Sequence, residues 1–196
     1  MVEERHPLIF SVLIPSVPSR HVQACALFDK ISQQAEGFDV EVLMLCDNKR
    51  RSVGLKREAL VQISRGDYVA FVDDDDDVAD DYIASIVPHA KRLAGSTVDV
   101  IIFDTLVTLN DGPDVICRHD LGFPNEQYNP AGFRCPPWQM YAWCGPLART
   151  TPFPDLNCGE DWTWCEAMLK HVRGAYKIYR VLHHYRFSDK TTEASH

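Results

Sequence analysis

The chain lacks the features that mark several common protein classes. Its seven cysteines are scattered, odd in number and contain no Cys-x-x-Cys pair. That pattern indicates reduced thiols and argues against a disulfide framework or a structural zinc site. The net charge is −8, and no block of lysine or arginine occurs. General nucleic-acid binding is therefore not expected.

Long hydrophobic runs are also missing. No apolar stretch approaches the length of a membrane-spanning helix, and the charged start, Met1 to His6, does not resemble a signal peptide. We therefore expect no membrane span and a cytoplasmic location. The 196 residues fit one domain, and the hydrophobic content of 45% is ordinary for a globular protein.

The most informative stretch is an apolar run followed by five aspartates. Residues 68–72 (Tyr-Val-Ala-Phe-Val) are typical of a strand buried on both faces, and Asp73 to Asp77 follow at once. Carboxylates about 4 Å apart repel by roughly 4 kcal/mol at an effective dielectric of 20, so such a cluster favours a cation. Oxygen ligands select Mg²⁺ or Mn²⁺. Ligands bind at the carboxyl ends of strands in open α/β sheets, so this position predicts a site.

Other interpretations of the aspartates can be compared with this one. An EF-hand loop starting at Asp73 would need glycine and glutamate where the chain has Val78 and Ala84, so that motif is excluded. A phosphatase-type motif with Asp74 as the nucleophile is a weaker alternative. The run could also be a solvated acidic loop, with Asp80 or Asp81 capping the next helix.

Strand and helix patterns alternate around this stretch. Residues 8–14 and 40–46 predict strands, and residues 21–34 between them have helical spacing. This order predicts a right-handed, parallel βαβ unit. Further helices are expected over 55–64 and from residue 82 to Gly95.

The second half is less regular. Residues 98–109 predict a strand, and the turn signal at 110–113 predicts a hairpin with 114–118. Residues 121–138 are rich in proline, glycine, asparagine and aromatics without a clear period, which is typical of a binding loop.

A helix to about His171 and a last strand at 176–185 complete the pattern. The expected fold is therefore an α/β single domain with a mainly parallel central sheet flanked by helices.

Six short motifs occur in a characteristic order. They are Ser11-Val12-Leu13-Ile14-Pro15-Ser16, Asp47, Gly54-x-Lys56-Arg57-Glu58, Gly66-Asp67-Tyr68 through Asp76, Gly159-Glu160-Asp161 and His184-Tyr185-Arg186-x-Ser188. Together they resemble family 2 glycosyltransferases of the GT-A (Rossmann-like) fold from about Phe10 to Ser188. Glu58 stands where that family usually has asparagine.

The resemblance implies roles in binding a nucleoside diphosphate sugar, with a UDP-sugar favoured. Pro15 and Ser16 belong to the donor loop, and Asp47 faces the donor's base. Lys56 or Arg57 faces the phosphates. Residues 8–109 would form the nucleotide-sugar-binding half of a single domain, and residues 110–188 the acceptor and catalytic-base half.

The same resemblance implies a metal site. Asp73 and Asp75 are expected to bridge Mn²⁺ or Mg²⁺ and the diphosphate, with Asp76 as a supporting ligand and Asp74 as a further donor contact. One of the adjacent residues His183 and His184 is expected to complete the site, with His184 favoured. For either one, a histidine hydrogen-bonded within the fold is an equally good interpretation.

Asp161 is the expected general base of an inverting transfer to an acceptor hydroxyl. Its alternative role is to stabilise the macrodipole in the first turn of a helix. The acceptor is not identified by the sequence: a glycan, a lipid-linked, a protein or a modified nucleobase hydroxyl all fit. An aspartate-nucleophile phosphatase and a non-catalytic nucleotide-sugar or cation-binding module are the alternative functions.

Overall fold

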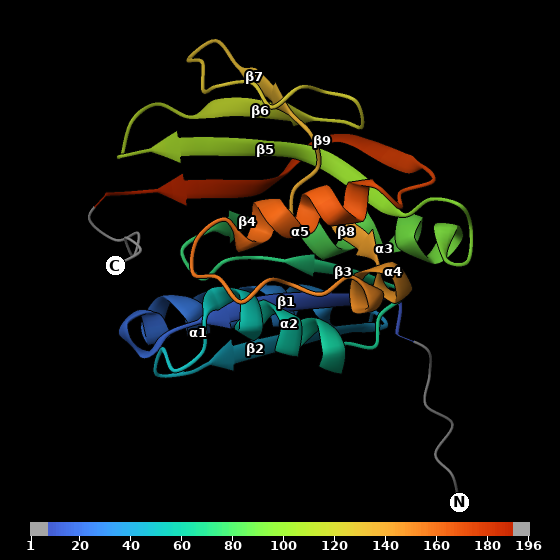
Figure 1. Ribbon diagram of the computed structural model, residues 1–196, viewed down its shortest axis with the longest axis horizontal. Coiled ribbons are helices and arrows are strands. Elements are labelled where there is room, and N and C mark those ends of the chain that lie inside the picture. The colour runs from blue at the N-terminus through green and yellow to red at the C-terminus, as the bar shows by residue number, and fades with distance from the viewer. Residues whose placement is uncertain (1–7, 190–196) are drawn as a thin grey trace, which may run out of the picture.

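The structure is a computed structural model that describes residues 8–189; the charged start at residues 1–6 and the end at residues 190–196 lie outside it. The elements in chain order are β1 (Phe10–Ser16), η1 (Pro18–Arg20), α1 (His21–Ala35), β2 (Val40–Cys46), α2 (Val53–Ile63), β3 (Tyr68–Phe71), β4 (Asp77–Val78), α3 (Tyr82–Leu93), β5 (Val100–Leu109), β6 (Val115–His119), β7 (Phe133–Cys135), β8 (Ala142–Cys144), α4 (Gly145–Thr150), α5 (Glu160–Leu169) and β9 (Ala175–Phe187). Figure 1 shows them as one sheet with helices against it.

The first half of the sheet is parallel, as the sequence predicts. β1 lies between β2 and β3, with Phe10 opposite both Val40 and Tyr68. The path of the sheet is β2-β1-β3-β8-β5-β6-β7, and β9 pairs with β5 in parallel and with β4 in the antiparallel sense. The mainly parallel α/β fold is therefore confirmed.

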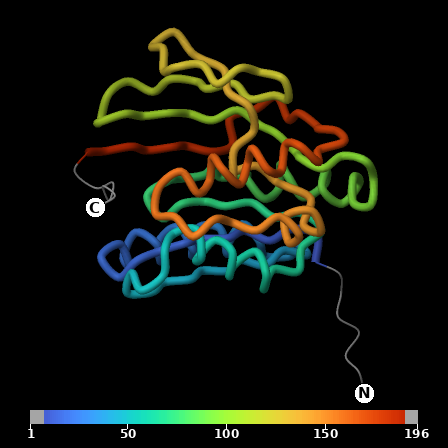
Figure 2. The backbone as a smooth tube through the Cα atoms, viewed as in Figure 1, coloured from blue at the N-terminus to red at the C-terminus, as the bar shows by residue number. Residues whose placement is uncertain are grey.

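Helices cover both faces of the sheet. On one face Phe10 packs against Tyr82 of α3, with ring centroids 6.2 Å apart. Phe71 points to the opposite face and meets Trp164 of α5 at 6.4 Å. Helix α2 contacts α4 and α5, whereas α1 contacts α3. Helices α2, α4 and α5 lie on the face of the sheet that is turned towards the viewer in Figures 1 and 2. None of the helices within residues 8–189 is long and apolar enough to span a bilayer.

The centre of the sheet contains a strand that the sequence did not reveal. β8 is only three residues long and runs antiparallel between β3 and β5, with Trp143 opposite both Val69 and Val100. Trp143 is fully buried and packs on Trp164 at 5.6 Å. This short strand joins the two halves of the sheet.

The second half continues from this strand. β5 and β6 form the predicted antiparallel hairpin, and the three-residue β7 lies in the segment expected to be only a loop. β9 runs beside β5 and reaches the aspartates, where Val78 of β4 pairs with His183. The last strand is thereby joined to the turn formed by Asp73 to Asp77, which we call the acidic turn.

The expected cap of α3 is wrong. Asp81 occupies the N-cap position without a side-chain capping hydrogen bond. Its carboxylate instead accepts from Ser85 at 3.0 Å and from Arg180 at 2.5 Å. The arginine arrives from β9, which the local sequence does not show.

Candidate active site

The five aspartates fan out from the end of β3. Val72 donates its backbone N–H to Leu13 at 3.0 Å, and Asp76 donates to the Asp73 carbonyl at 3.0 Å, which closes a tight turn. Four of the carboxylates meet different basic side chains: Asp73 meets Arg57, Asp74 meets Arg20, Asp76 meets His183, and Asp77 meets Lys30 and Arg186. The turn therefore directs like charges apart instead of gathering them at one point.

Arg57 of α2 is a buried cation of this cluster. Its two terminal nitrogens each lie 2.9 Å from an oxygen of Asp73, and its Nε donates to Glu160 at 3.1 Å. Burial alone would raise the pKa of Asp73, but the guanidinium outweighs it and lowers that pKa. Burial raises the pKa of Glu160. Arg57 Nη2 donates a hydrogen bond to Asp73, whereas Nη1 and the other Asp73 oxygen lie close but have no hydrogen-bond partner among the described residues. This ion pair fixes the first aspartate, and the bond to Glu160 links α2 to the start of α5.

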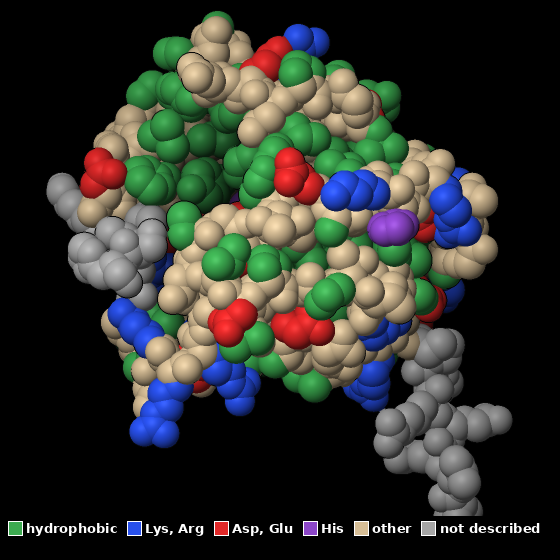
Figure 3. Space-filling model, in the orientation of Figure 1, with side chains coloured by type: hydrophobic (Ala, Val, Ile, Leu, Met, Phe, Trp, Pro, Cys, Tyr) green, Lys and Arg blue, Asp and Glu red, His purple; other side chains and the backbone are tan. Residues whose placement is uncertain are grey.

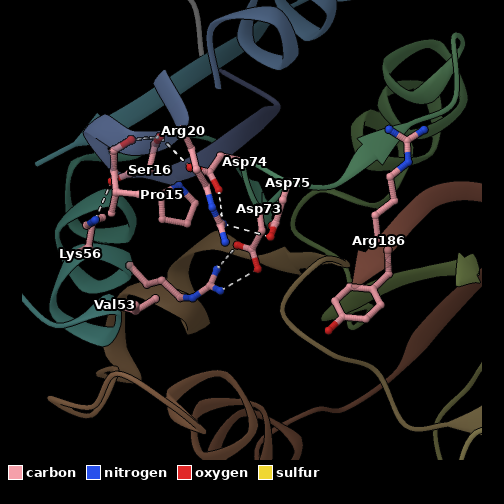
Figure 4. Close-up of a pocket in the computed structure, with 12 residues that line it drawn as sticks. Pro15, Ser16, Arg20, Val53, Lys56, Asp73, Asp74, Asp75 and Arg186 are labelled. Atoms are coloured by element: carbon pink, nitrogen blue, oxygen red, sulfur yellow. Dashed lines mark hydrogen bonds and ion pairs between the residues drawn. The ribbon is translucent and has the colours of Figure 1, made fainter. Parts of the chain in front are cut away.

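Arg20 lies between the next two aspartates (Figure 4). Its Nη1 is 2.7 Å from Asp74 and 3.0 Å from Asp75. Asp74 is buried and also accepts from Ser16 Oγ at 2.7 Å. Burial, and then the charge of Asp76, raise the pKa of Asp75 to about 7. Asp75 is therefore the carboxylate that would gain most from a further cation.

Lys56 and Asp47 form a second charged pair. The buried Lys56 ammonium donates to the Ser16 carbonyl at 2.6 Å and lies 3.0 Å from Asp47. Burial would raise the pKa of Asp47, but the hydrogen bond from Lys56 lowers it overall. Asp47 Oδ2 is buried without a hydrogen-bond partner among the described residues, so it is free to accept a hydrogen bond from a ligand.

These side chains line one cleft of about 200 Å³, which we call the charged cleft. Its wall residues are Pro15, Ser16, Val17, Arg20, Val53, Lys56, Arg57, Asp73, Asp74, Asp75, Tyr185 and Arg186. Figure 4 shows them around a common space, with the Arg186 guanidinium turned away from Asp73, Asp74 and Asp75; it pairs with Asp77 instead. The structure thus brings six of the seven residues expected to bind the donor to one cleft, and places Asp47 outside its wall, against Lys56.

The two histidines of β9 point in different directions. His183 is buried, and its Nε2 lies 3.3 Å from Asp76. Neither of its ring nitrogens has a hydrogen-bond partner among the described residues. His184, the residue expected to bind metal, contacts Thr108 at 2.6 Å. The structure therefore places His183, and not His184, against the acidic turn.

Asp161 lies in the first turn of α5, beside Glu160. Its carboxylate is half-buried and accepts from the Trp162 backbone N–H at 2.7 Å. It is absent from the wall of the charged cleft, but its negative charge raises the pKa of both Arg57 and Tyr185. Asp161 is thus close to two residues of the cleft wall.

The oxygen-rich turn suits a hard divalent cation in one particular way. Within residues 8–189, no three Asp, Glu, His or Cys side chains are gathered into a metal site of their own. Magnesium is commonly held by one or two carboxylates, with waters and substrate phosphates as the remaining ligands. The crowded carboxylate of Asp75 fits that mode, because the charges of Asp76 and Asp73 both oppose its ionisation.

The roles of three contributors to the cluster were not predicted from the sequence. Arg20 lies in η1, Glu160 pairs with Arg57 from 103 residues away, and Tyr185 closes the cleft from β9. Glu160 and Tyr185 belong to two of the six motifs, but nothing local indicated these contacts. Arg20 had no signal at all.

A charged cleft at the carboxyl ends of parallel strands is typical of the nucleotide-binding α/β proteins. The family model for glycosyl transferase family 2 matches residues 27–142. The chain belongs to that family.

Solved structures agree on the fold. S. aureus TarS 1–349 in complex with UDP-GlcNAc superimposes with a TM-score of 0.62 at 13% identity, over 95% of this chain and 60% of that one. The complex of the same protein with UDP gives 0.59 at 14% identity, over 90% and 60%. S. aureus TarS itself gives 0.61 at 13%, over 90% and 36%. The chain thus spans three fifths or less of these proteins, and no curated protein sequence matches it.

Proposed function

We propose that this chain transfers a sugar from a nucleoside diphosphate sugar to an acceptor hydroxyl, by single displacement with inversion at the anomeric carbon. The observation that carries the proposal is the charged cleft, in which Arg20, Lys56 and Arg57 lie beside the aspartates at the end of β3. Such a mixture of fixed cations and a crowded carboxylate suits a diphosphate and its counter-ion.

The base and the phosphates of the donor have separate places in this proposal. The unpartnered oxygen of Asp47 accepts an N–H of the base. Arg20 and Lys56 face the diphosphate, whose charge grows as the glycosidic bond breaks. A uridine nucleotide is favoured because the TarS structures include complexes with UDP and UDP-GlcNAc.

Asp161 is the general base of the proposed reaction. It takes the proton of the acceptor hydroxyl as that oxygen forms its bond to the anomeric carbon, and the bond to the diphosphate oxygen breaks on the opposite face. Within residues 8–189, Asp161 forms no ion pair with a cationic side chain, whereas Glu160 is held by Arg57. This difference favours Asp161 over its neighbour as the free carboxylate.

A divalent cation, Mn²⁺ or Mg²⁺, is part of the proposal. Asp75 would hold it, with Asp73 and Asp76 as neighbours and His183 behind Asp76. When bound, the ion would neutralise charge on the departing diphosphate. The side chains of the cleft bind and orient the donor around it.

The phosphatase alternative is not favoured by the geometry. Its nucleophile, Asp74, is buried and accepts hydrogen bonds from Ser16 and Arg20. A carboxylate held on both oxygens is poorly placed to attack phosphorus. The non-catalytic alternative, a module that only binds, is separated from the proposal by experiment.

Calorimetry with UDP and GDP, each with and without Mn²⁺, tests the binding half of the proposal. We expect Asp75→Ala to lose metal-dependent binding, whereas Asp161→Asn should bind UDP as the wild type does. Equal metal-dependent binding by Asp75→Ala and the wild type would contradict the assignment of the turn.

A screen of nucleotide sugars for metal-dependent nucleotide release tests the catalytic half. We expect Asp161→Asn to lower transfer by about 10²–10⁴-fold. A protein that binds UDP with metal and turns over no donor would be the binding module instead. Release of phosphate without any nucleotide, lost in Asp74→Asn, would indicate the phosphatase.

A further inference from the structure

A second hollow lies beside the charged cleft, and the proposed reaction has not used it. It has a volume of about 210 Å³ and is lined by Tyr128, Phe133, Trp138, Met140 and Tyr185, among others. We call it the aromatic hollow. Figure 3 shows hydrophobic side chains gathered in a depression over β5 and β6.

Several polar side chains of this hollow are already engaged by the protein, although the buried Trp138 Nε1 has no hydrogen-bond partner among the described residues. Thr105 Oγ1 lies 3.2 Å from the Tyr141 hydroxyl, and His119 Nδ1 lies 3.0 Å from the Pro136 carbonyl. Glu126 accepts from Arg134 at 2.6 Å. A sugar ring carries several hydroxyls that would each need a partner on burial, so these walls suit it poorly.

The walls instead suit a flat ring. Tyr128 and Phe133 stand with their centroids 5.7 Å apart, and Trp138 adds an indole. Aromatic walls stack on planar rings of many kinds, because every such ring has a π-face. A volume of about 210 Å³ exceeds that of one six-membered aromatic ring with a short substituent.

The hollow is continuous with the proposed catalytic groups. Tyr185 lines both the charged cleft and the aromatic hollow. Trp138 meets Trp162, the neighbour of Asp161, with ring centroids 6.5 Å apart. A ring held in the hollow would therefore carry its substituent past Tyr185 towards both Asp161 and the donor.

From these contacts we infer that the aromatic hollow binds the acceptor, and that the acceptor presents a planar aromatic or heteroaromatic ring whose short side arm carries the reacting hydroxyl. The inference rests on the proposed function, since it names the acceptor class of the same reaction. It places Tyr128 as the outer wall of the ring site and Tyr185 as the boundary between acceptor and donor.

The test measures ligand binding by saturation-transfer NMR, with no donor needed. The probes are benzyl alcohol and 5-(hydroxymethyl)uracil as carbocyclic and heterocyclic ring alcohols, with cyclohexylmethanol and methyl glucoside as non-planar comparisons. We expect one or both flat probes to bind more tightly than the non-planar ones. The flat probe that binds more tightly shows whether the site prefers a carbocyclic or a heterocyclic ring.

The variants Tyr128→Ala, Tyr128→Phe and Tyr179→Ala complete the test. Tyr128 is 38% exposed and Tyr179 is 86% exposed on β9, so each should fold, as checked by circular dichroism. Tyr128→Ala should weaken the flat probe by about tenfold, whereas Tyr128→Phe and Tyr179→Ala should bind as the wild type does. Unchanged binding in Tyr128→Ala, or a preference for methyl glucoside, overturns the inference.

A UDP titration of the same proteins separates this inference from the proposed function. UDP binding without flat-ring binding would refute the ring acceptor and leave the donor site intact. Flat-ring binding without any nucleotide binding would refute the proposed transfer. Both outcomes can be measured with the wild-type protein alone.

Discussion

The charged cleft and the aromatic hollow share Tyr185 but are built on opposite principles. In the cleft, buried ions depend on one another: Arg57 holds Asp73 and Glu160, and Arg20 holds Asp74 and Asp75. In the hollow, rings and apolar chains share the walls with a few polar side chains, and one of the rings, Tyr128, is partly exposed. Removing one charge should therefore disturb the whole cleft, whereas removing one ring should alter only the space it filled.

The largest expected effect comes from Arg57→Met. It leaves the buried Glu160 and the partly buried Asp73 without their cation, and a broken buried pair costs about 3–5 kcal/mol of unfolding free energy. Urea unfolding measures the loss. Arg180→Met, which breaks an exposed pair with Asp81, is the matched control and should cost less than about 1 kcal/mol. Equal losses of unfolding free energy in the two variants would show that the ion pairs of the charged cleft are no more important for stability than an exposed pair.

Gly54→Ala tests the docking that brings Glu160 to Arg57. A Cβ at this position would lie 1.9 Å from the Pro154 carbonyl oxygen, so α2 must shift from the 151–159 segment. Overpacking of this kind costs about 1–3 kcal/mol. Thermal unfolding should show it, whereas Leu55→Ala, at a partly exposed position of the same turn, should be milder. A Gly54→Ala protein as stable as the wild type would mean that the 151–159 segment can move away from α2 at little cost in free energy.

Asp75→Asn should stabilise the protein in metal-free buffer. Burial and Asp76 raise the pKa of Asp75 to about 7, so the folded state binds this proton more tightly than the unfolded chain, and stability is lost as the pH rises from about 4 to 7. Allowing for solvent screening, the free energy of unfolding of the variant should exceed that of the wild type by on the order of 2 kcal/mol at pH 8, which corresponds to roughly 4–8 °C in Tm. Near pH 4 the two proteins should be equally stable.

Differential scanning calorimetry at pH 8 and pH 4, with EDTA present, measures the Tm of Asp75→Asn and of the wild type. Asp80→Asn is the control, because its carboxylate is 99% exposed. A gain from Asp75→Asn that is equally large at pH 4 would exclude titration of this group as the cause.

The smallest effect is expected in the hollow. Tyr128→Ala removes a partly exposed ring and should change the unfolding free energy by no more than about 0.5 kcal/mol. Urea unfolding of Tyr128→Ala and Arg57→Met under the same conditions compares the two losses of unfolding free energy directly. A loss as large as that of Arg57→Met would mean that the hollow is part of the folding core.

The sequence predicts best where a pattern is local. The apolar run before Asp73 identifies a central strand, and the turn at 110–113 identifies the hairpin. β8 escapes because three residues cannot display a period, although Trp143 within it is fully buried. The sheet's mainly parallel character is therefore readable from sequence, and its antiparallel junction is not.

The candidate site divides in the same way. The residues of the acidic turn are evident from their position after a strand. Their partners are not, because Arg57 meets Glu160 across 103 residues and Asp76 meets His183 through the pairing of β4 with β9. The choice between two adjacent histidines depended on which face of β9 met the turn, and that is a property of register.

β7 is the last strand of the sheet and pairs with β6 alone along its path. The residues between 120 and 132 leave and re-enter the fold at this margin, away from the strands β1 and β3 that lead into the charged cleft. A foreign segment grafted there would replace one wall of the aromatic hollow while the ion-rich half stays as it is. Selection among related enzymes could change what is glycosylated by rewriting this border, without rebuilding the machinery that activates the sugar.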